Sequence, residues 1–288
     1  MGGNLENIAI FGPGLMGGSL LMALRKHSPG SRLSVWARRQ TAVDDVISRG
    51  LTDFASTDAA AVACEAGCLV LCLPVERMEE LAASIAGAVS PDALVTDVGS
   101  VKGPVVGELE EVFSRHGNFV GSHPMCGSEE AGLSAARADL YEGATCVVTP
   151  TARSRPDLVK QACDLWTKVG GRVRQMDPAR HDRAAALVSH VPHLAAAALV
   201  ELVGAESRDV RELCAGGFRD TTRVASASPE LWTGILSLNR TEAARGLGEL
   251  ADLLASVKKA LEEDRLDDVR SLLSAAAAHR GEILTGQT

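Results

Sequence analysis

Aromatic side chains make up only 3% of this 288-residue chain, although apolar residues in total make up 46%. A core can therefore form, but it must be built mainly from aliphatic side chains and alanine. Basic charge is also in deficit, since the formal net charge is −8. That balance argues against a general nucleic-acid-binding protein. A small anionic ligand is still compatible with it, because local arginines decide whether such a ligand binds.

Long apolar runs and a leader segment are missing as well. No apolar run approaches the roughly 20 residues that a membrane-spanning helix needs, and no basic, apolar leader opens the chain. The seven cysteines are odd in number and scattered. Cys64, Cys68 and Cys72 are spaced like a ladder of metal ligands, but Cys72 falls in a strand-like run, so we expect buried free thiols and no metal. These features predict a cytoplasmic protein without membrane contact.

Strand and helix patterns alternate over the first part of the chain, as in a Rossmann-type α/β fold with a doubly wound parallel sheet. Short apolar runs predict strands, and the segments between them have the spacing of helices. The expected strands cover residues 7–11, 32–36, 68–75, 93–98, 119–122, 145–149 and 172–176, and the expected helices cover 18–27, 41–49, 78–89, 101–116 and 156–169.

The alternation stops near Pro178, and no convincing strand follows. Leucines at three- and four-residue spacing after residue 247 predict amphipathic helices. Residues 181–203 predict one long helix that is apolar nearly all round, which must be buried. We therefore expect a dinucleotide-binding domain over residues 1–178 and an all-α domain over residues 179–288, in which a partner subunit of a homodimer covers the long helix.

A Gly-x-Gly-x-x-Gly turn at Gly12, Gly14 and Gly17 follows the first predicted strand and opens the first helix. In a dinucleotide site these glycines allow the tight turn, the approach of the pyrophosphate and close packing of helix on strand. The pyrophosphate then faces the first helical amides. The predicted cofactor contacts are Gly12, Gly14, Leu15, Met16, Gly17, Ala37, Arg38, Arg39, Leu73 and Pro74.

The end of the second predicted strand bears on the choice between NAD and NADP. A carboxylate there would hold the ribose 2′-hydroxyl of NAD. This sequence instead has Ala37 followed by Arg38 and Arg39. Guanidinium groups pair with a 2′-phosphate, so we favour NADP. The alternative is two solvated arginines, one of them stacked on adenine, with NAD as the cofactor.

His123 is the candidate proton acceptor. It stands in the segment Gly-Ser-His-Pro-Met-Cys-Gly-Ser-Glu at the predicted carboxyl edge of the sheet, where ligands of such folds bind. Imidazole titrates near neutral pH and suits removal of a hydroxyl proton. The alternative is a histidine that caps the next helix, but Ser128 and the glutamates after it would form a better cap. Ser100, on the same edge, would orient the imidazole or bond the substrate hydroxyl.

Two further pairs are candidates for the substrate site. His190 and His193 share one face of the long helix and are open to three interpretations: a metal pair that lacks an apparent third ligand, two core histidines, or two residues that line a cleft. Arg219 and Arg223 follow a double glycine and share a helix face. They form either a clamp for a carboxylate or a solvated basic face.

These segments together resemble the prephenate dehydrogenase family of tyrosine biosynthesis, which includes arogenate and cyclohexadienyl dehydrogenases. The pairing of GSHPMxGxE with SHxPH is specific to that family, whereas the GxGLMG start is shared with β-hydroxyacid dehydrogenases. The matching stretches run in order from residue 8 to residue 232: GPGLMGGSL, LCLPV, TDVGSVKG, GSHPMCGSEEAG, LYEGATCVVTP, SHVPH, and GGFRDTTRVA with SPELW after it.

The resemblance implies a Rossmann domain followed by a helical dimerisation domain, and oxidative decarboxylation of prephenate to 4-hydroxyphenylpyruvate or of arogenate to tyrosine. It implies that His123 is the catalytic histidine with Ser100 as its partner, and that Arg223 binds the ring carboxylate. His190 and His193 would lie near the substrate side chain. Three positions differ among relatives: Ser128 stands where some carry threonine, Arg219 where some carry lysine, and Ala37 where relatives that use NAD often carry aspartate.

Two other functions compete with this interpretation. A β-hydroxyacid dehydrogenase would rely on a lysine in the helical domain, but residues 179–257 contain none, and only Lys258 and Lys259 follow. A non-catalytic redox sensor that binds a dinucleotide would need neither His123 nor the arginine pair. The sequence does not choose between prephenate and arogenate as the substrate.

Overall fold

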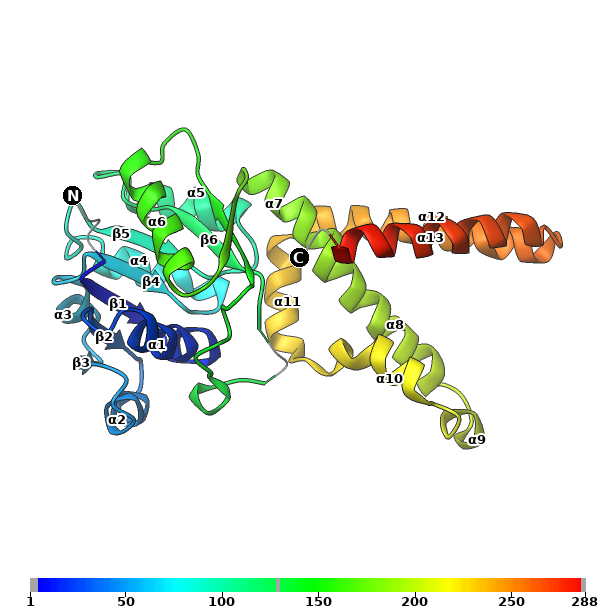
Figure 1. Ribbon diagram of the computed structural model, residues 1–288, viewed down its shortest axis with the longest axis horizontal. Coiled ribbons are helices and arrows are strands. Elements are labelled where there is room, and N and C mark those ends of the chain that lie inside the picture. Colours follow the sequence, from blue (N-terminus) through cyan, green and yellow to red (C-terminus); the bar gives the residue numbers. More distant parts are fainter. Residues whose placement is uncertain (1–4, 128–129, 286–288) are drawn as a thin grey trace. The chain divides into compact units, whose positions relative to one another are not determined.

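A five-stranded parallel sheet forms the centre of the first part of the chain, as the alternating pattern predicts. The computed structural model describes residues 5–127 and 130–285. In space the strands follow the order β3-β2-β1-β4-β5 (Figure 1). Their bounds are β1 Asn7–Phe11, β2 Arg32–Trp36, β3 Phe54–Ser56, β4 Cys68–Leu71 and β5 Leu94–Asp97.

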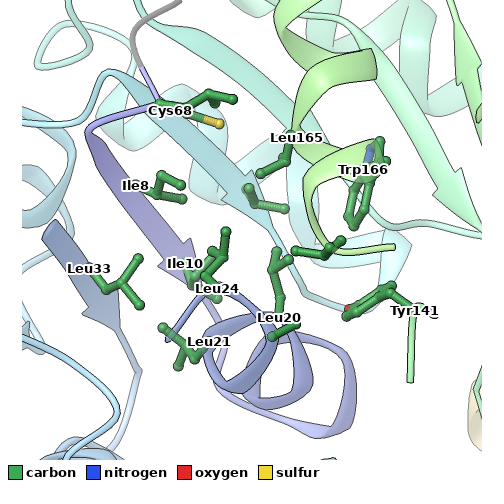
Figure 2. Close-up of a cluster of buried hydrophobic side chains, with 14 of the residues drawn as sticks. Ile8, Ile10, Leu20, Leu21, Leu24, Leu33, Cys68, Tyr141, Leu165 and Trp166 are labelled. Carbon is green, nitrogen blue, oxygen red and sulfur yellow. The ribbon is translucent and has the colours of Figure 1, made fainter. Parts of the chain in front are cut away.

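One face of this sheet is covered by α1 (Leu15–His27) and α6 (Pro156–Lys168). Ile8 and Ile10 of β1 point to this face and pack with leucines of α1, as Figure 2 shows. Trp166 of α6 is fully buried in the same cluster. Strands that are buried on both faces read as continuous apolar runs, which is why the sequence pattern located β1 and β4 well.

The opposite face carries Ala9 and Phe11 of β1, which pack with residues of three helices. These helices are α3 (Ala59–Ala63), α4 (Met78–Ile85) and α5 (Gly103–Val112), while α2 (Gln40–Ser48) follows β2. The sequence did not predict β3 or α3. Both are very short, and α3 consists almost entirely of alanine, so neither shows a periodic pattern; its start is set instead by the Asp58 cap, whose carboxylate accepts from two backbone amides.

A second, three-stranded sheet corrects one part of the prediction. It contains β6 (Gly121–Pro124), β7 (Thr145–Thr149) and β8 (Arg172–Gln175). β6 runs antiparallel to β7, and β7 runs parallel to β8. A parallel neighbour needs a long crossover, usually through a helix. The described residues between β6 and β7 contain only the 3-10 turn Leu133–Ala135, and so β7 returns antiparallel.

The rest of the described chain is helical, in agreement with the sequence pattern. The first of these helices runs from Pro178 to Gly204 and is interrupted by one π-helical turn at Ala186–His190. Figure 1 shows α10 beside α8, and contacts join them. The bounds are α7 Pro178–Ala185, α8 Val191–Gly204, α9 Arg208–Arg211, α10 Gly216–Thr222, α11 Pro229–Leu238, α12 Arg240–Glu262 and α13 Leu266–Thr285.

Contacts divide the chain into two compact units, residues 1–240 and 241–288. The first unit therefore holds both sheets and the helices through α11. The second contains most of α12 and all of α13, which a short turn joins with Asp264 at a φ of 53°. The domain boundary expected at residues 178 and 179 remains a prediction.

The stretch Pro178–Gly204 is long and apolar enough to cross a membrane by length and composition, which the search for apolar runs did not anticipate. Core helices of soluble proteins meet the same criterion. This stretch is less buried than expected, because only 28% of its most apolar window is covered. Val188 and Leu202 are 65% and 66% exposed. The expectation that the helix is fully covered therefore does not hold within one chain.

The three cysteines of the sequence ladder lie in different environments. Cys68 is buried in β4 and Cys72 is half-buried after it, whereas Cys64 is exposed at the end of α3. The expectation of a buried thiol is thus wrong for Cys64, because the residue that caps the end of α3 faces solvent. All seven cysteines are free thiols.

Candidate active site

The glycine turn after β1 is built so that two of its positions accept no side chain. Gly12 has a φ of +100°, and a Cβ there would lie 2.5 Å from the carbonyl oxygen of Cys72. A Cβ at Gly17 would lie 2.2 Å from the carbonyl oxygen of Gly12. Both contacts are far inside van der Waals distance. The turn therefore depends on glycine for its backbone path and for the close packing of α1.

A cavity of about 910 Å³ opens in front of this turn. It lies at the carboxyl ends of β1, β2 and β4, where the strand order reverses and ligands of open α/β sheets bind. Among the predicted cofactor residues, those that line the cavity are Gly12, Gly14, Ala37, Arg38, Arg39, Leu73 and Pro74. Leu15, Met16 and Gly17 belong to the first turn of α1, which starts directly behind it.

The residues around the cavity fit a dinucleotide. Gly14 is the N-cap of α1 and supplies no side-chain hydrogen bond, and the first turn holds no acidic residue. The first amides of the helix are thus left to bind an anion, which the helix dipole also favours. A Cβ at Gly14 would meet no atom within 4 Å, so the backbone is open to a ligand there.

The far end of the cavity carries the two arginines that bear on cofactor choice. Arg38 and Arg39 are both exposed, and neither has an ion-pair partner among the described residues. Asp45 also lines the cavity, but its carboxylate accepts from Nε of Arg49 at 2.8 Å. The indole of Trp36 stacks on Phe11, with ring centroids 5.7 Å apart. This end of the cavity therefore presents an aromatic wall and positive charge.

His123 lies within β6, at the start of a hydrogen-bonded chain of side chains. Its imidazole is 9% exposed, and its Nδ1 lies 2.8 Å from Nε2 of His181. Nδ1 of His181 in turn lies 2.8 Å from Oδ1 of Asp182. The carboxylate of Asp182 also accepts from the backbone amides of Lys102 and Gly103, each at 2.7 Å. This polar network therefore joins β6 of the second sheet to α7 and to the start of α5.

Electrostatics keep His123 neutral and Asp182 ionised. Burial holds the pKa of His123 well below its usual 6.5, and the neighbouring His181, Lys102 and His190 act in the same direction. Burial alone would raise the pKa of Asp182, but hydrogen bonds from His181 and the two backbone amides lower it overall. When Nδ1 of a neutral imidazole donates its hydrogen to a neighbour, Nε2 keeps a lone pair that can accept a proton.

A buried ion pair holds the backbone of Ser122, the residue before His123. The ammonium of Lys102 donates to the Asp97 carboxylate and, at 3.0 Å, to the carbonyl oxygen of Ser122. The backbone amide of Ser122 donates to Asp97 at 3.0 Å. Burial lowers the pKa of Lys102, while the charge of Asp97 opposes that shift. Both charged groups are fully buried, and the network ties the end of β5 to β6 beside the imidazole.

Ser100, the expected partner of His123, is half-buried in the loop between β5 and α5. In the described part of the chain, His123 hydrogen-bonds to His181 rather than to Ser100. The pairing of Ser100 with the histidine remains a prediction. Ser128 lies outside the described residues.

His190 and His193 are both buried, and a tryptophan joins them. Trp232 of α11 stacks on His193, with ring centroids 3.6 Å apart, and meets the edge of His190 at 5.9 Å. Asn239 lies 3.3 Å from Nδ1 of His190 and donates to the carbonyl oxygen of Asp182. Burial lowers the pKa of His190 to about 4, although Asp182 opposes the shift. Nδ1 of His193 is buried without a hydrogen-bond partner in the described chain.

The arginine pair lies at the end of a short helix. α10 contains Arg219 and ends at Thr222, and Arg223 opens the 3-10 turn Arg223–Ser226. Both arginines are exposed. The turn that starts at Arg223 packs against α8, which carries His193. Within the described residues, no group of three or more His, Cys, Asp or Glu side chains could hold a metal ion.

Among the residues of this region that escaped the sequence analysis are His181, Asp182, Trp232 and Asn239, together with the buried Lys102. His181 and Asp182 are adjacent at the start of a long stretch that is otherwise largely apolar. This histidine and acid side by side could have indicated a functional site. Trp232 is one of only three tryptophans in the chain. The scarcity of tryptophan could have drawn attention to Trp232, whereas no feature of the sequence pointed to Asn239.

Comparisons with known proteins bear on the family of the chain. A family model described as "Prephenate dehydrogenase, nucleotide-binding domain" matches residues 20–175. A second, described as "Prephenate dehydrogenase, dimerization domain", matches residues 177–275.

Two curated relatives match over most of the chain. A cyclohexadienyl dehydrogenase of Zymomonas mobilis is 34% identical over 81% of this chain and 81% of its own length. A prephenate dehydrogenase of Bacillus subtilis is 30% identical over 96% of this chain and 75% of its own length.

Solved structures show the same similarity. The prephenate dehydrogenase of Aquifex aeolicus, in complex with hydroxyphenyl propionate and NAD+, is 30% identical and has a TM-score of 0.91, with 96% of this chain and 98% of that one covered. An arogenate dehydrogenase of Synechocystis is 28% identical with a TM-score of 0.84, over 96% and 99% of the two chains. The chain therefore belongs to the prephenate dehydrogenase family.

Proposed function

We propose that this protein catalyses the oxidative decarboxylation of prephenate, or of arogenate, with a nicotinamide dinucleotide as cofactor. The observation that carries the proposal is the state of His123: a buried, neutral imidazole whose Nδ1 is held by His181. Such a group is suited to accept the proton of a substrate hydroxyl. The relatives named above act on these two substrates, which supports the assignment.

The cofactor would occupy the cavity at the carboxyl ends of β1, β2 and β4. The turn at Gly12–Gly17 and the first amides of α1 would hold its pyrophosphate. When bound, a nicotinamide supplies the acceptor for the hydride that leaves the substrate ring. The protein has to bind the substrate against that ring, orient it and stabilise the developing charge.

His123 takes the proton of the ring hydroxyl on its free nitrogen as the carbon that bears the hydroxyl is oxidised. Arg223 holds the carboxylate across the ring by a charge-assisted hydrogen bond until carbon dioxide departs. His190 and His193 would lie toward the substrate side chain, with Arg219, Ser128 and Ser100 as further contacts. The ring becomes aromatic as carbon dioxide is lost, and this change supplies the driving force. The ring oxygen, left as a phenolate, then takes the proton back from His123.

We further propose NADP as the preferred cofactor, because Arg38 and Arg39 face the cavity and Ala37 stands where a ribose-binding carboxylate would be needed for NAD. The test is a two-by-two assay that follows formation of the reduced nicotinamide by absorbance, with prephenate and arogenate each against NAD and NADP. Turnover with neither substrate would reject the proposed function. Higher kcat/KM with NAD than with NADP would reject the cofactor preference.

We also propose a homodimer in the cytoplasm that binds neither nucleic acid nor membranes. Exposed apolar side chains along Pro178–Gly204, including Val188 and Leu202, form a face that a second copy would cover. The family model over residues 177–275 is described as a dimerization domain. Seven free thiols are typical of a reducing compartment. Light scattering coupled to gel filtration measures the mass in solution, and a monomer at micromolar concentration would contradict the dimer.

A further inference from the structure

We propose that His181 and Asp182 are positioning residues that set the tautomer and the orientation of His123, so that Nε2 of His123 is the atom that accepts the substrate proton. This inference rests on the proposed function. It concerns two residues that the sequence motifs did not single out. Its basis is the continuous chain from His123 Nδ1 through His181 to the Asp182 carboxylate, with both hydrogen bonds at 2.8 Å.

The direction of each hydrogen bond follows from the carboxylate end. Asp182 is ionised, and an ionised carboxylate only accepts. Nδ1 of His181 must therefore carry a hydrogen and donate it to Oδ1 of Asp182. With His181 neutral, which is part of the proposal, its other nitrogen is then an acceptor. Nε2 of His181 accordingly accepts from Nδ1 of His123, which leaves the Nε2 lone pair of His123 unprotonated.

The two oxygens of Asp182 are held in place by more than His181. Oδ1 accepts from the amide of Lys102 and Oδ2 from the amide of Gly103, each at 2.7 Å, at the first turn of α5. The side chains of His181 and Asp182 are 2% and 8% exposed. A carboxylate with three donors and almost no solvent cannot rotate freely. The hydrogen-bonded chain is therefore fixed at the end remote from the substrate.

The surroundings explain why a supporting chain is useful. Three groups face His123 from other elements: His181 of α7, Lys102 before α5, and His190 of the π-helical turn. Together with burial they disfavour a positive imidazole, although Asp97 pairs with the charge of Lys102. When the substrate O–H bond breaks and an N–H bond forms at Nε2 of His123, the Nδ1–H donor becomes part of a cation. Its hydrogen bond to His181 strengthens accordingly, with the Asp182 anion behind it.

The primary experiment measures the tautomer directly, without turnover. ¹⁵N-labelled histidine is read by two-dimensional NMR in the full-length protein, and the His123 signals are assigned by their loss in His123→Asn. We expect His123 to be protonated on Nδ1 in the wild type. In His181→Leu, which has no acceptor, the population shifts toward the Nε2–H form. His181→Gln supplies an amide oxygen as acceptor and keeps the Nδ1–H form.

Kinetics give the second readout. His181→Leu should lower kcat by about 10- to 100-fold, the loss seen when the partner that orients a metal-bound histidine is removed, with the KM for each substrate changed less than about threefold. His181→Gln should regain most of the lost kcat. The matched control is His116→Leu, the same exchange at a half-buried histidine of the first unit, and it should leave both readouts unchanged.

The outcomes separate the two proposals. A wild-type His123 protonated on Nε2, or a His181→Leu enzyme that keeps both the Nδ1–H form and full kcat, overturns the positioning role. Equal losses of kcat in the Leu and Gln variants overturn it too. If His181→Leu does not fold, the tautomer of His123 in the wild type and in His181→Gln still tests the positioning role. Lack of turnover by the wild type rejects the proposed function but leaves the tautomer measurement valid.

Discussion

The imidazole of His193 lies parallel to the indole of Trp232, with ring centroids 3.6 Å apart and an interplanar angle of 11°. The two rings come from α8 and α11, so this stack joins helices that are separate in sequence. It also fixes the direction of Nδ1 of His193, the buried nitrogen without a hydrogen-bond partner in the described chain. A ring held in this way loses little further entropy when it takes part in binding.

Loss of the stack should weaken substrate binding. Trp232→Leu removes the indole that holds His193, and such ring pairs contribute about 0.5–1.5 kcal/mol beyond burial. We expect the KM for the substrate to rise roughly 2- to 12-fold, with the KM for the cofactor unchanged. Steady-state kinetics with each ligand varied in turn measures both. A rise confined to the cofactor KM would argue against this position of His193 in the site.

Removal of the proposed base should affect the rate rather than cofactor binding. His123→Asn keeps a polar side chain of similar size but cannot accept the proton. We expect kcat to fall by roughly 10²–10⁴, as is usual for the loss of a general base. Fluorescence titration should show cofactor affinity close to that of the wild type. Full turnover in this variant would show that the base is another group.

Arg223→Ala tests the carboxylate clamp. Loss of a hydrogen bond between two charged groups costs about 1.5–3 kcal/mol, which corresponds to a rise in substrate KM of roughly 10- to 100-fold. Arg219→Ala is the matched comparison, since it removes an exposed arginine one helical turn earlier. Initial-rate assays decide between the two positions, and a normal KM in Arg223→Ala would remove the clamp from the mechanism.

The pH dependence of the reaction should have an acid limb at unusually low pH. His123 must be neutral to act, and burial holds its pKa well below 6.5. Activity is then retained as pH falls past the usual histidine range, and is lost only when pH falls through the lowered pKa. A kcat profile measured over the stable pH range checks this. An acid limb centred at or above pH 6.5 would contradict the neutral, buried imidazole.

Cofactor selectivity should depend on the two exposed arginines. The double variant Arg38→Ala with Arg39→Ala removes both guanidinium groups from the cavity wall. We expect the Kd for NADP to rise about 10- to 100-fold, the worth of a charge-assisted phosphate contact, while the Kd for NAD changes little. Isothermal titration with each dinucleotide gives the comparison. Equal weakening of both would place the arginines elsewhere than at the 2′-phosphate.

The sequence predicted most of the sheet and the general place of the cofactor site, because both depend on local patterns. Buried strands give apolar runs, and the turn at Gly12 and Gly17 needs glycine for steric reasons that leave a motif. The antiparallel direction of β7 could not be predicted from such local patterns. Strand direction depends on the connection, and the segment between β6 and β7 has no periodic pattern.

The polar network around His123 was predicted only in part for a similar reason. His123 itself stands in a distinctive motif, but His181 is 58 positions away in sequence and lies against it only after α7 has packed on the Rossmann part. Lys102 lay inside the helix expected over residues 101–116 and carried no prediction of its own, although the structure buries it completely. Contacts between elements far apart in sequence leave no spacing rule that one sequence can reveal.

The double use of Asp182 has a consequence for motion. Its carboxylate holds His181 and also closes the first turn of α5, so the helical part cannot swing away from the Rossmann part at this point without exposing two backbone amides. Each hydrogen bond to a charged group is worth about 1.5–3 kcal/mol. Separation of α7 from the first turn of α5 is thus disfavoured.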